Sequence, residues 1–502
     1  MEDGAPHVQL NLYAPPLADL EDSPDAIDKD SLPPVLADTS FWAMTWTAFF
    51  GAFNDNLYEQ LLLLTVISMT AATAAATHES GNDGQFLVQF VFAIPFVIFS
   101  GFAGTISDRN SKRTIVILTK WAEIAVTLLG VVAFLLIPWI GTSGIIAVLF
   151  LLTTHSTFYG PAKYGILPEM LRENDLPRAT SVMLLFTFLA IIGGTAAGGL
   201  LLTLLKSSGL EGQVWIAQFV CVGVAVLGCA CSYFLREVPV ADPDLEFRWS
   251  DCFVPQDTLA LLWSDRPLLW GVLASCMFWS AGVIVKLGVN AFGKLQLHLS
   301  DMSTSILTAA VAVGIMLGSI VAGFFPERLW GARLVTTGAW GIVLSLAALT
   351  YLGHSLETLP DAKEVARLQQ LGTDASHDDA HKLIGVQLIQ SAGVWRALPL
   401  LILMGAATGL FIVPIQVFLQ ARPPAEQKGR MIAAQAFFNW LAMSVSALLY
   451  GGMEVVLGWF DWPRSATFAL TAALILPIAL FYTIPCEVEP AAEKEPHPER
   501  EK

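Results

Sequence analysis

The chain contains the stretch Gly104-Thr-Ile-Ser-Asp108-Arg109-Asn-Ser-Lys112-Arg113 between two long apolar runs. Residues 85–103 before it contain no charged side chain, and residues 114–137 after it contain only two. A transmembrane helix needs about 20 predominantly apolar residues to cross the hydrocarbon core of a bilayer. Both runs are long enough, so the stretch is predicted to be a short charged loop between two membrane-spanning helices.

The same alternation of apolar runs and polar breaks continues along the whole chain. Hydrophobic residues make up 55% of the 502 residues, charged residues only 14%, and the mean hydropathy is +0.60. Soluble domains carry about 25% charged residues. The sequence therefore predicts an all-α membrane protein with twelve transmembrane helices. The predicted spans are residues 41–72, 85–106, 114–137, 143–160, 179–205, 214–235, 268–292, 302–325, 332–353, 397–420, 430–457 and 464–484.

The second half of the chain repeats features of the first. Gly104 and Asp108-Arg109 follow the second predicted span, and Gly323 and Glu327-Arg328 follow the eighth with the same spacing. Internal repeats of this kind are typical of secondary transporters. We therefore predict two pseudo-symmetric six-helix bundles. The predicted division is a disordered cytoplasmic tail at 1–40, an N-terminal bundle at 41–235, a cytoplasmic linker at 236–267, a C-terminal bundle at 268–485 with an extracytoplasmic loop insertion at 354–396, and a cytoplasmic tail at 486–502.

Lysine and arginine gather in alternate loops. Residues 107–113 and 422–430 are rich in them, whereas residues 77–84 and 138–142 contain none. Basic residues in short loops mark the cytoplasmic side of a membrane protein. We therefore expect both termini to be cytoplasmic.

Composition also excludes several classes of function. The net charge is −16 and no basic stripe is present, which argues against binding to nucleic acid. The six cysteines show no spacing typical of a metal site, and no phosphate-binding glycine-lysine-serine/threonine motif occurs. We therefore predict no enzymatic activity, no catalytic residues, no metal and no cofactor.

Polar side chains interrupt the first predicted span. Asp55 would lie about 21 Å along a helix that starts at Phe41. A charge this deep in hydrocarbon usually marks an ion or substrate path. Glu59 is four residues on, on the same face, and two close carboxylates tend to share a proton or a cation. Alternatively, Asp55 belongs to a structural pair or a helix break and Glu59 only supports it. The candidate substrate or coupling residues here are Asn54, Asp55, Asn56, Tyr58 and Glu59.

Lys120 and Glu123 lie three residues apart in the third predicted span. Side chains with this spacing are neighbours on a helix, so the two can simply satisfy each other. In the functional alternative, Lys120 contacts a phosphate or acts as a switching partner for Asp55. Both residues are therefore candidates for the substrate or coupling site.

Other polar residues of the spans also have a structural and a functional interpretation. Lys163, at the cytoplasmic end of the fourth span, either snorkels to the membrane surface or contacts substrate. Gln416 and Asn439 either hydrogen-bond between helices or belong to the substrate site. His155 is either a hydrogen-bonded interior residue or a proton carrier. Four glycines of the fifth span have the spacing of a close helix-packing face and are assigned no chemistry: Gly193, Gly194, Gly198 and Gly199.

The charged stretch between the second and third spans combines a carboxylate with several cations. Such groups can bridge helix ends in one conformation and separate in another. We therefore predict a gating role for this loop. The candidate gating residues are Gly104, Asp108, Arg109, Lys112 and Arg113.

This glycine, Asp-Arg and basic-pair pattern resembles the signature loop of the major facilitator superfamily, with Ser111 in place of the usual glycine. Three further stretches are similar to the bacterial lysophospholipid transporter family of that superfamily. The similarity covers roughly residues 41–485 without the 354–396 insertion. The stretches are Phe50-Gly-Ala-Phe-Asn54-Asp55-Asn56-Leu-Tyr58, Tyr159-Gly-Pro161-Ala-Lys163-Tyr164-Gly165-Ile-Leu-Pro168-Glu169, and Phe411-Ile-Val-Pro414 through Gln420-Ala-Arg422 and Gly429-Arg430 to Phe438-Asn439.

The resemblance implies the major facilitator fold and alternating access, in which lysophospholipids such as lysophosphatidylethanolamine move across the inner membrane. The partners would then be this amphipathic lipid, the bilayer and a separate acyltransferase, because some relatives are fused to one. We expect a monomer, with coupling to sodium or to protons left open. Judged on the residues alone, a drug/proton antiporter or an exporter of another hydrophobic small molecule is the alternative.

Overall fold

The computed structural model describes residues 32–77, 83–172, 175–210, 212–238, 240, 254, 256–323, 327–355, 377–423 and 428–482. This part of the chain is helical and contains no strand. Within these residues, ten helices are long and apolar enough to cross a membrane, and α1 and the 16-residue α15 lie where the sequence predicts the other two spans. The long helices are α1 (Thr39–Thr77), α2 (Gln85–Arg109), α3 (Lys112–Leu135), α5 (Ser143–Met170), α6 (Leu176–Ser207), α7 (Trp215–Ser232), α9 (Arg266–Ala291), α10 (Asp301–Gly323), α11 (Glu327–Ser355), α13 (His377–Ala421), α14 (Lys428–Trp459) and α15 (Ala466–Phe481). The short ones are η3 (Val35–Ala37), α4 (Ile137–Ile140), α8 (Gln256–Ser264) and η6 (Phe292–Gln296).

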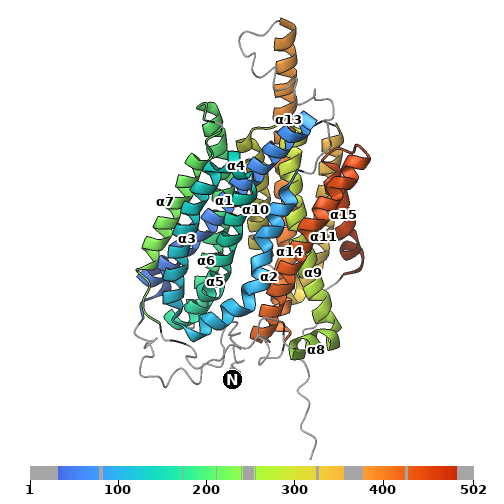
Figure 1. Ribbon diagram of the computed structural model, residues 1–502. Helices are drawn as coiled ribbons and strands as arrows, with labels where there is room; N and C mark the ends of the chain where they lie inside the picture. Colours follow the sequence, from blue (N-terminus) through green and yellow to red (C-terminus); the bar gives the residue numbers. More distant parts are fainter. Residues whose placement is uncertain are drawn as a thin grey trace, which may run out of the picture.

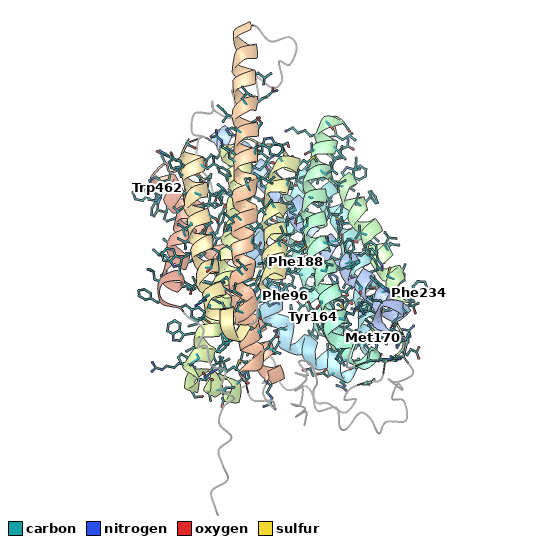
Figure 2. The ribbon with its side chains drawn as sticks, turned by 180° about the vertical axis from the view of Figure 1, so that it is seen from behind. Phe96, Tyr164, Met170, Phe188, Phe234 and Trp462 are labelled. Atoms are coloured by element: carbon teal, nitrogen blue, oxygen red, sulfur yellow. The ribbon has the colours of Figure 1, made fainter. Side chains whose placement is uncertain are left out.

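The helices stand side by side in one bundle with two distinct ends (Figure 1). The first turns of α13 project beyond the bundle at what we call the upper end, and α1 starts near the opposite, lower end (Figure 1). Large apolar side chains lie on the outside, such as Phe234, which is 74% exposed, and Trp462, on the opposite flank (Figure 2). An apolar exterior of this extent fits a surface that faces lipid rather than water.

The helix α13 begins much earlier than predicted. Residues 377–396, expected to belong to a loop insertion, form its first turns, and residues 356–376 lie outside the described part of the chain. Residues 377–396 contain no proline, so the backbone hydrogen-bond ladder continues beyond the apolar part of the helix. The side chain of Gln390 anchors these turns by donating to the carbonyl oxygens of Leu297 and His298, at 3.2 and 2.8 Å.

The helix α5 also differs from the prediction, which ended the fourth span at residue 160. The structure extends it to Met170, with Pro161 and Pro168 inside the helix. Buried residues at helical spacing explain the extension, because Tyr159, Ile166 and Met170 pack into one core with α1 and α3. The lysophospholipid-transporter-like stretch therefore lies within a helix, not after one.

Of the predicted tails and linker, residues 1–31, 241–253 and 483–502 lie outside the described residues. Within the predicted linker at 236–267, residues 256–264 form the short helix α8. Residues 32–38, predicted to belong to a disordered tail, are packed, since Val35 is buried in the same core as α1.

Three apolar cores hold the bundle together. We call α1 to α7 the first half and α9 to α15 the second half. One core lies in the second half and the adjoining α8, and it contains Leu346, Ile415 and Phe468. Another lies in the first half, around Phe41 and Ile166. The third joins the halves, because Leu57, Leu61 and Leu63 of α1 cluster with Leu287 of α9 and Tyr450 of α14.

The polar contacts between the halves gather toward the upper end. Lys286 of α9 lies 2.6 Å from Glu59 of α1, and Gln60 donates to Asn290 at 3.2 Å. The backbone N–H of Asp83, just before α2, donates to Glu454 of α14 at 3.1 Å. In this conformation the two halves are therefore joined at the upper end of the bundle.

The glycines of α6 form a close helix-packing face, as the sequence predicts. An added Cβ on Gly194 would lie 2.4 Å from the Phe53 carbonyl oxygen of α1, in the same half. An added Cβ on Gly199 would lie 2.3 Å from the Asp301 carbonyl oxygen of α10, in the other half. Real side chains do not come this close to backbone, so each glycine permits a different contact.

Because Gly199 faces the other half and Gly194 faces its own, we expect substitutions at the two positions to have different effects. A Gly199→Val variant should fold but resist joining of the halves at the upper end, because its clash is with α10 of the second half. The buried Thr308 of α10, replaced by cysteine in a cysteine-free background, should then react several-fold faster with a soluble thiol reagent. Gly194→Val is the matched control and should reduce the yield of folded protein, because its clash lies within one half. Unchanged reactivity of Thr308→Cys in well-folded Gly199→Val would contradict the prediction.

Candidate functional site

Polar side chains of α1, α3 and α5 meet in the middle of the first half. Asn54 donates from Nδ2 to Oε1 of Glu123 at 2.7 Å, and Ser156 donates from its hydroxyl to Oδ2 of Asp55 at 2.8 Å. These contacts connect α1 to α3 and to α5 at a depth where the surroundings are apolar. We call this group the central cluster, and its members are Asn54, Asp55, Lys120, Glu123, His155 and Ser156.

Within the central cluster, Lys120 pairs with Glu123. Its ammonium lies 2.7 Å from Oε2 of Glu123, and the two side chains are 1% and 0% exposed. The ammonium also lies 4.7 Å from the centroid of the Tyr159 ring, within cation–π range. The mutual pairing of Lys120 and Glu123 is therefore the arrangement in this conformation, and the predicted pairing of Lys120 with Asp55 is not present.

Small residues make room for the buried lysine. An added Cβ on Gly51 of α1 would lie 2.5 Å from Nζ of Lys120, and one on Gly228 of α7 would lie 3.7 Å from its Cδ. The long side chain therefore passes close to both α1 and α7, and the glycine of α1 leaves room for its ammonium group. The glycine at the start of the Phe50–Tyr58 stretch thus has a direct structural role.

Two acceptor atoms of the cluster have no hydrogen-bond partner among the described residues. They are Oδ1 of Asn54 and Oδ1 of Asp55, and both atoms are buried. A buried polar atom without a partner costs free energy, so such atoms mark places where a ligand donor or water can bind. Both acceptors lie on α1, and Asp55 is only partly buried as a residue.

The carboxylate of Glu59 is separate from that of Asp55. The expectation that the two share a proton or a cation is wrong for this conformation, because Glu59 pairs with Lys286 across the two halves at 2.6 Å. The spacing of the two residues on α1 places both carboxylates on one face of the helix, but it does not predict which side chains of other helices contact them. Lys286 was not predicted as a site residue, since a lysine near the end of a span is ordinarily explained by snorkelling.

Asn56 and Tyr58 satisfy their polar groups locally. Asn56 donates from Nδ2 to the carbonyl oxygen of Ala52 at 2.8 Å, one turn earlier on the same helix. The fully buried Tyr58 donates its hydroxyl to the carbonyl oxygen of Ile145 on α5 at 2.9 Å. In this conformation both residues stabilise α1 and its packing and are not part of the central cluster.

Lys163 lies inside α5 and is only 8% exposed, so it does not snorkel to a membrane surface. Its ammonium donates to the hydroxyl of Thr187 on α6 at 3.4 Å and lies 5.1 Å from the centroid of the Tyr164 ring. The structure therefore places Lys163 between two helices of the first half, outside the central cluster.

Gln416 and Asn439 belong to a second polar group, in the second half. The hydroxyl of Ser275 on α9 donates to Oδ1 of Asn439 at 3.1 Å, and Gln435 donates to Oε1 of Gln416 at 2.9 Å. Gln435 also lies 3.3 Å from the Ser275 hydroxyl. This neutral network joins α9, α13 and α14. Ser275 and Gln435 were not predicted, because serine and glutamine occur in many helices without a functional role.

The predicted gating residues lie at the lower end of the first half. Gly104, Asp108 and Arg109 belong to the last turns of α2, and Lys112 and Arg113 begin α3. Lys112 forms an ion pair with Glu169 of α5, and Arg113 lies 2.7 Å from Glu237 after α7. The basic pair therefore ties α3 to α5 and to the chain beyond α7 in this conformation.

A further polar network at the upper end was not predicted. Asp83 accepts from the hydroxyl of Tyr450 at 2.9 Å and from Nε2 of Gln85 at 2.6 Å. Glu454 lies 2.6 Å from Arg464 and accepts the Asp83 N–H. These residues are far apart in sequence. The carboxylate of Glu454 within a predicted span was the sequence feature that could have indicated this network.

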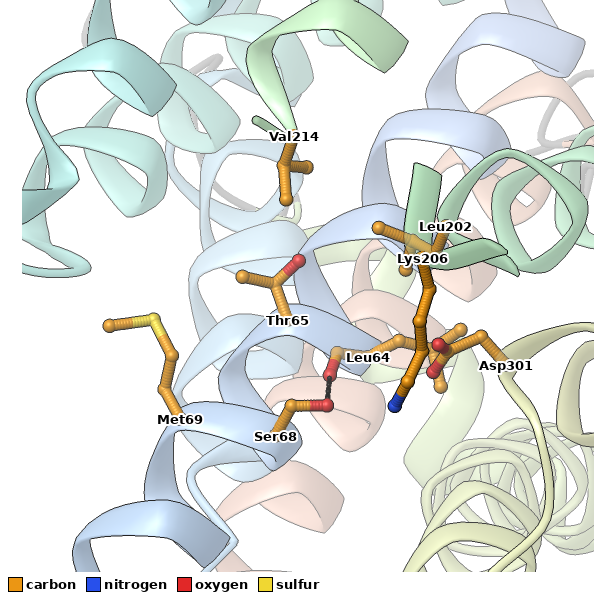
Figure 3. A pocket seen from close by; sticks show the side chains of 8 residues that line it. All are labelled: Leu64, Thr65, Ser68, Met69, Leu202, Lys206, Val214 and Asp301. Carbon is orange, nitrogen blue, oxygen red and sulfur yellow. Dashed lines mark hydrogen bonds between the residues drawn. The ribbon is translucent and has the colours of Figure 1, made fainter. Parts of the chain in front are cut away.

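A cavity of about 250 Å³ lies nearby, lined by α1, α6 and α10 and by Val214 (Figure 3). Its walls are mainly apolar, with Leu64, Leu202 and Met69, and Lys206 and Asp301 reach its edge (Figure 3). Asp301 already pairs with Lys294 at 2.6 Å. None of the predicted site residues lines this cavity. Among the described residues, no group of three histidine, cysteine or acidic side chains is placed to hold a metal ion.

Comparisons with known proteins agree with this architecture. The chain is 28% identical over 430 residues to the lysophospholipid transporter LplT of Enterobacter sp. (strain 638), covering 82% of this chain and 89% of that protein. It is 25% identical over 385 residues to LplT of Photorhabdus laumondii subsp. laumondii, covering 75% and 79%.

Solved structures share the fold at much lower identity. A D-xylose-proton symporter superimposes with a TM-score of 0.61 at 14% identity, covering 90% of this chain and 100% of that one. A mutant of the nucleoside transporter NupG gives 0.58 at 13% identity, covering 87% and 98%. The sequence model of the Major Facilitator Superfamily matches residues 35–361. With this match and the shared fold, the chain belongs to the Major Facilitator Superfamily.

Proposed function

We propose that this transporter moves lysophospholipids across the bacterial inner membrane by alternating access. The observation that carries the proposal is the central cluster, a buried set of cationic, anionic and amide groups in an otherwise apolar bundle. Membership in the superfamily makes the chain a multi-pass membrane transporter and not an enzyme. The similarity to LplT proteins over most of the chain favours a lysophospholipid over a drug or another hydrophobic molecule.

The chemistry of the central cluster suits a head group that carries a phosphate and an amine. Lys120 supplies a cation for the phosphate, and a charge-assisted contact with phosphate is among the stronger hydrogen bonds available to proteins. Oδ1 of Asp55 and Oδ1 of Asn54 are acceptors without partners among the described residues, available to an ammonium group. We assign Asp55 the main coupling or gating role and Lys120 an assisting one, released from Glu123 when the phosphate binds.

The orientation we propose places the lower end in the cytoplasm, with both termini. The basic residues of the stretch 107–113, predicted to be cytoplasmic, lie in the last turn of α2 and the first turn of α3, at this lower end. The halves joined at the upper end then close the path to the outside. The lysophospholipid would leave toward the cytoplasmic leaflet, where a separate acyltransferase would re-acylate it, and one copy of the chain would suffice.

Cysteine labelling tests this orientation. Ser264 at the end of α8 and Ser391 in the projecting turns of α13 are both exposed, near opposite ends of the bundle. In a cysteine-free background, Ser391→Cys should react with an impermeant thiol reagent in spheroplasts, and Ser264→Cys should react only after lysis. The reverse pattern would show that the termini lie outside.

A vesicle assay tests the function. Purified full-length protein in proteoliposomes should transfer labelled lysophosphatidylethanolamine into a pool protected from extraction by albumin. Empty vesicles provide the background rate. A lysophospholipid rate at this background, together with efflux of a hydrophobic cationic dye, would favour the drug/proton antiporter instead. Transfer of lysophospholipid without dye efflux supports the proposal.

A further inference from the structure

Four side chains of the second half form a hydrogen-bond network of neutral groups, which we call the amide network. The hydroxyl of Ser275 on α9 donates to Oδ1 of Asn439 at 3.1 Å, and it accepts from Nε2 of Gln435 and of Gln416 at 3.3 and 3.5 Å. Oε1 of Gln416 accepts from Nε2 of Gln435 at 2.9 Å. A hydroxyl has one hydrogen and two lone pairs, so the hydroxyl of Ser275 is fully used, and both ends of the Gln416 amide have partners.

Two polar atoms of the amide network have no partner among the described residues. They are Oε1 of Gln435, an acceptor, and Nδ2 of Asn439, a donor. The two residues lie one turn apart on α14, and the other end of each amide contacts the same Ser275 hydroxyl, so the two atoms lie close together. Gln435 and Asn439 remain 6% and 9% exposed, so a small group can reach them. A donor beside an acceptor is the complement of a hydroxyl group, which itself donates and accepts.

The amide network lies at a similar depth in the bundle to the central cluster. Trp440, which follows Asn439 on α14, stacks on Phe96 of α2 with the ring centroids 3.8 Å apart. One turn further along α2, Phe99 packs against Phe158 of α5 at 6.2 Å, and Phe158 is within one turn of the α5 residues of the central cluster. A substrate between the halves can therefore contact the central cluster with one part and the amide network with another.

We infer that Gln435 and Asn439 bind the free glycerol hydroxyl of the lysophospholipid and thereby reject lipids that lack it. The inference rests on the proposed function and names the basis of its selectivity. When the acyl chain is on the terminal glycerol carbon, this hydroxyl is on the carbon next to the one that carries the phosphate, the group that Lys120 would bind. In a diacyl phospholipid an ester takes its place. An ester oxygen can accept from Asn439 but has no hydrogen for Gln435, and a buried acceptor without a partner is unfavourable.

A substrate analogue tests this recognition without changing the number of acyl chains. The deoxy analogue of lysophosphatidylethanolamine has a hydrogen in place of the hydroxyl and keeps the phosphate, the amine and the single chain. Labelled lysophosphatidylethanolamine and its deoxy analogue would compete in the same proteoliposomes containing full-length protein. Wild-type protein should transfer the deoxy analogue about tenfold to a hundredfold more slowly, because both polar atoms then stay without a partner.

Substitutions in the amide network connect this ratio of rates to the two atoms. Gln435→Met combined with Asn439→Leu keeps the side chains near their original size and removes both atoms, so the double variant should transfer the two lipids at nearly equal rates. Gln218→Met is the matched control, because it removes a buried amide of the first half that donates to the carbonyl oxygen of Thr127, and it should keep the wild-type ratio. A purely structural effect would slow both lipids equally. If the double variant does not fold, Gln435→Met alone should lower the ratio severalfold.

Two outcomes would overturn the inference while the proposed function stands. One is wild-type protein that transfers the deoxy analogue as fast as lysophosphatidylethanolamine, which would show that the hydroxyl is not recognised. The other is a folded Gln435→Met variant, alone or with Asn439→Leu, that keeps the wild-type ratio, which would give the amide network only a structural role. If wild-type protein transfers neither lipid, the proposed function itself fails, and the inference about its selectivity fails with it.

Discussion

Replacing Asp55 by asparagine should leave the amount of folded protein unchanged and slow transport about tenfold to a hundredfold, the equivalent of losing one contact to a charged group. Asparagine keeps the size of the side chain and an oxygen that can accept from Ser156, so the contact between α1 and α5 should survive. The carboxylate offered to the substrate amine is lost. Transport per folded molecule, measured in vesicles against folded protein measured by size-exclusion chromatography, separates the two effects.

The same substitution at Asp461 is the matched control, because this residue is exposed in the loop after α14. Asp461 has φ of 50°, a conformation that asparagine adopts as readily as aspartate, so Asp461→Asn should transport at the wild-type rate. A wild-type rate with unchanged ion dependence in Asp55→Asn would remove Asp55 from the coupling site. Loss of folded protein would instead give Asp55 a structural role.

Replacing Lys120 by alanine should destabilise the protein by about 3–5 kcal/mol, because it leaves the buried carboxylate of Glu123 without its lysine partner. Glu123 is 0% exposed, so no water replaces the ammonium group as a partner of its carboxylate. We expect a large loss of folded protein and a lower unfolding temperature. Fluorescence-detected size-exclusion chromatography after heating measures both.

A second variant separates stability from transport. Lys120→Met with Glu123→Gln removes both charges of the pair and keeps an oxygen that can accept from Asn54, so folding should recover. Transport should stay low, because no lysine remains for the phosphate. If this double variant folds and transports at the wild-type rate, Lys120 has only a structural role and the assignment of Asp55 stands without it.

The sequence alone determined where the helices lie, because the hydrocarbon core demands apolar runs of a set length. Predicted spans such as 85–106 and 302–325 differ from α2 and α10 by at most a few residues. It failed where polar residues continue a helix beyond the apolar run, as in residues 377–396 of α13 and the last turns of α5. Hydropathy cannot detect these turns, which are stabilised by packing and by contacts such as that of Gln390 with Leu297.

The sequence also located most of the polar groups in the spans, because a charge in hydrocarbon stands out against its surroundings. It paired Lys120 with Glu123 as one of two alternatives, since that contact lies within one helix and follows from spacing. Only the tertiary structure decided that Asn54 meets Glu123, that Asp55 meets Ser156, and that Glu59 meets Lys286. Helical periodicity fixes the face on which a side chain lies, whereas its partner depends on which helix packs against that face and at what height.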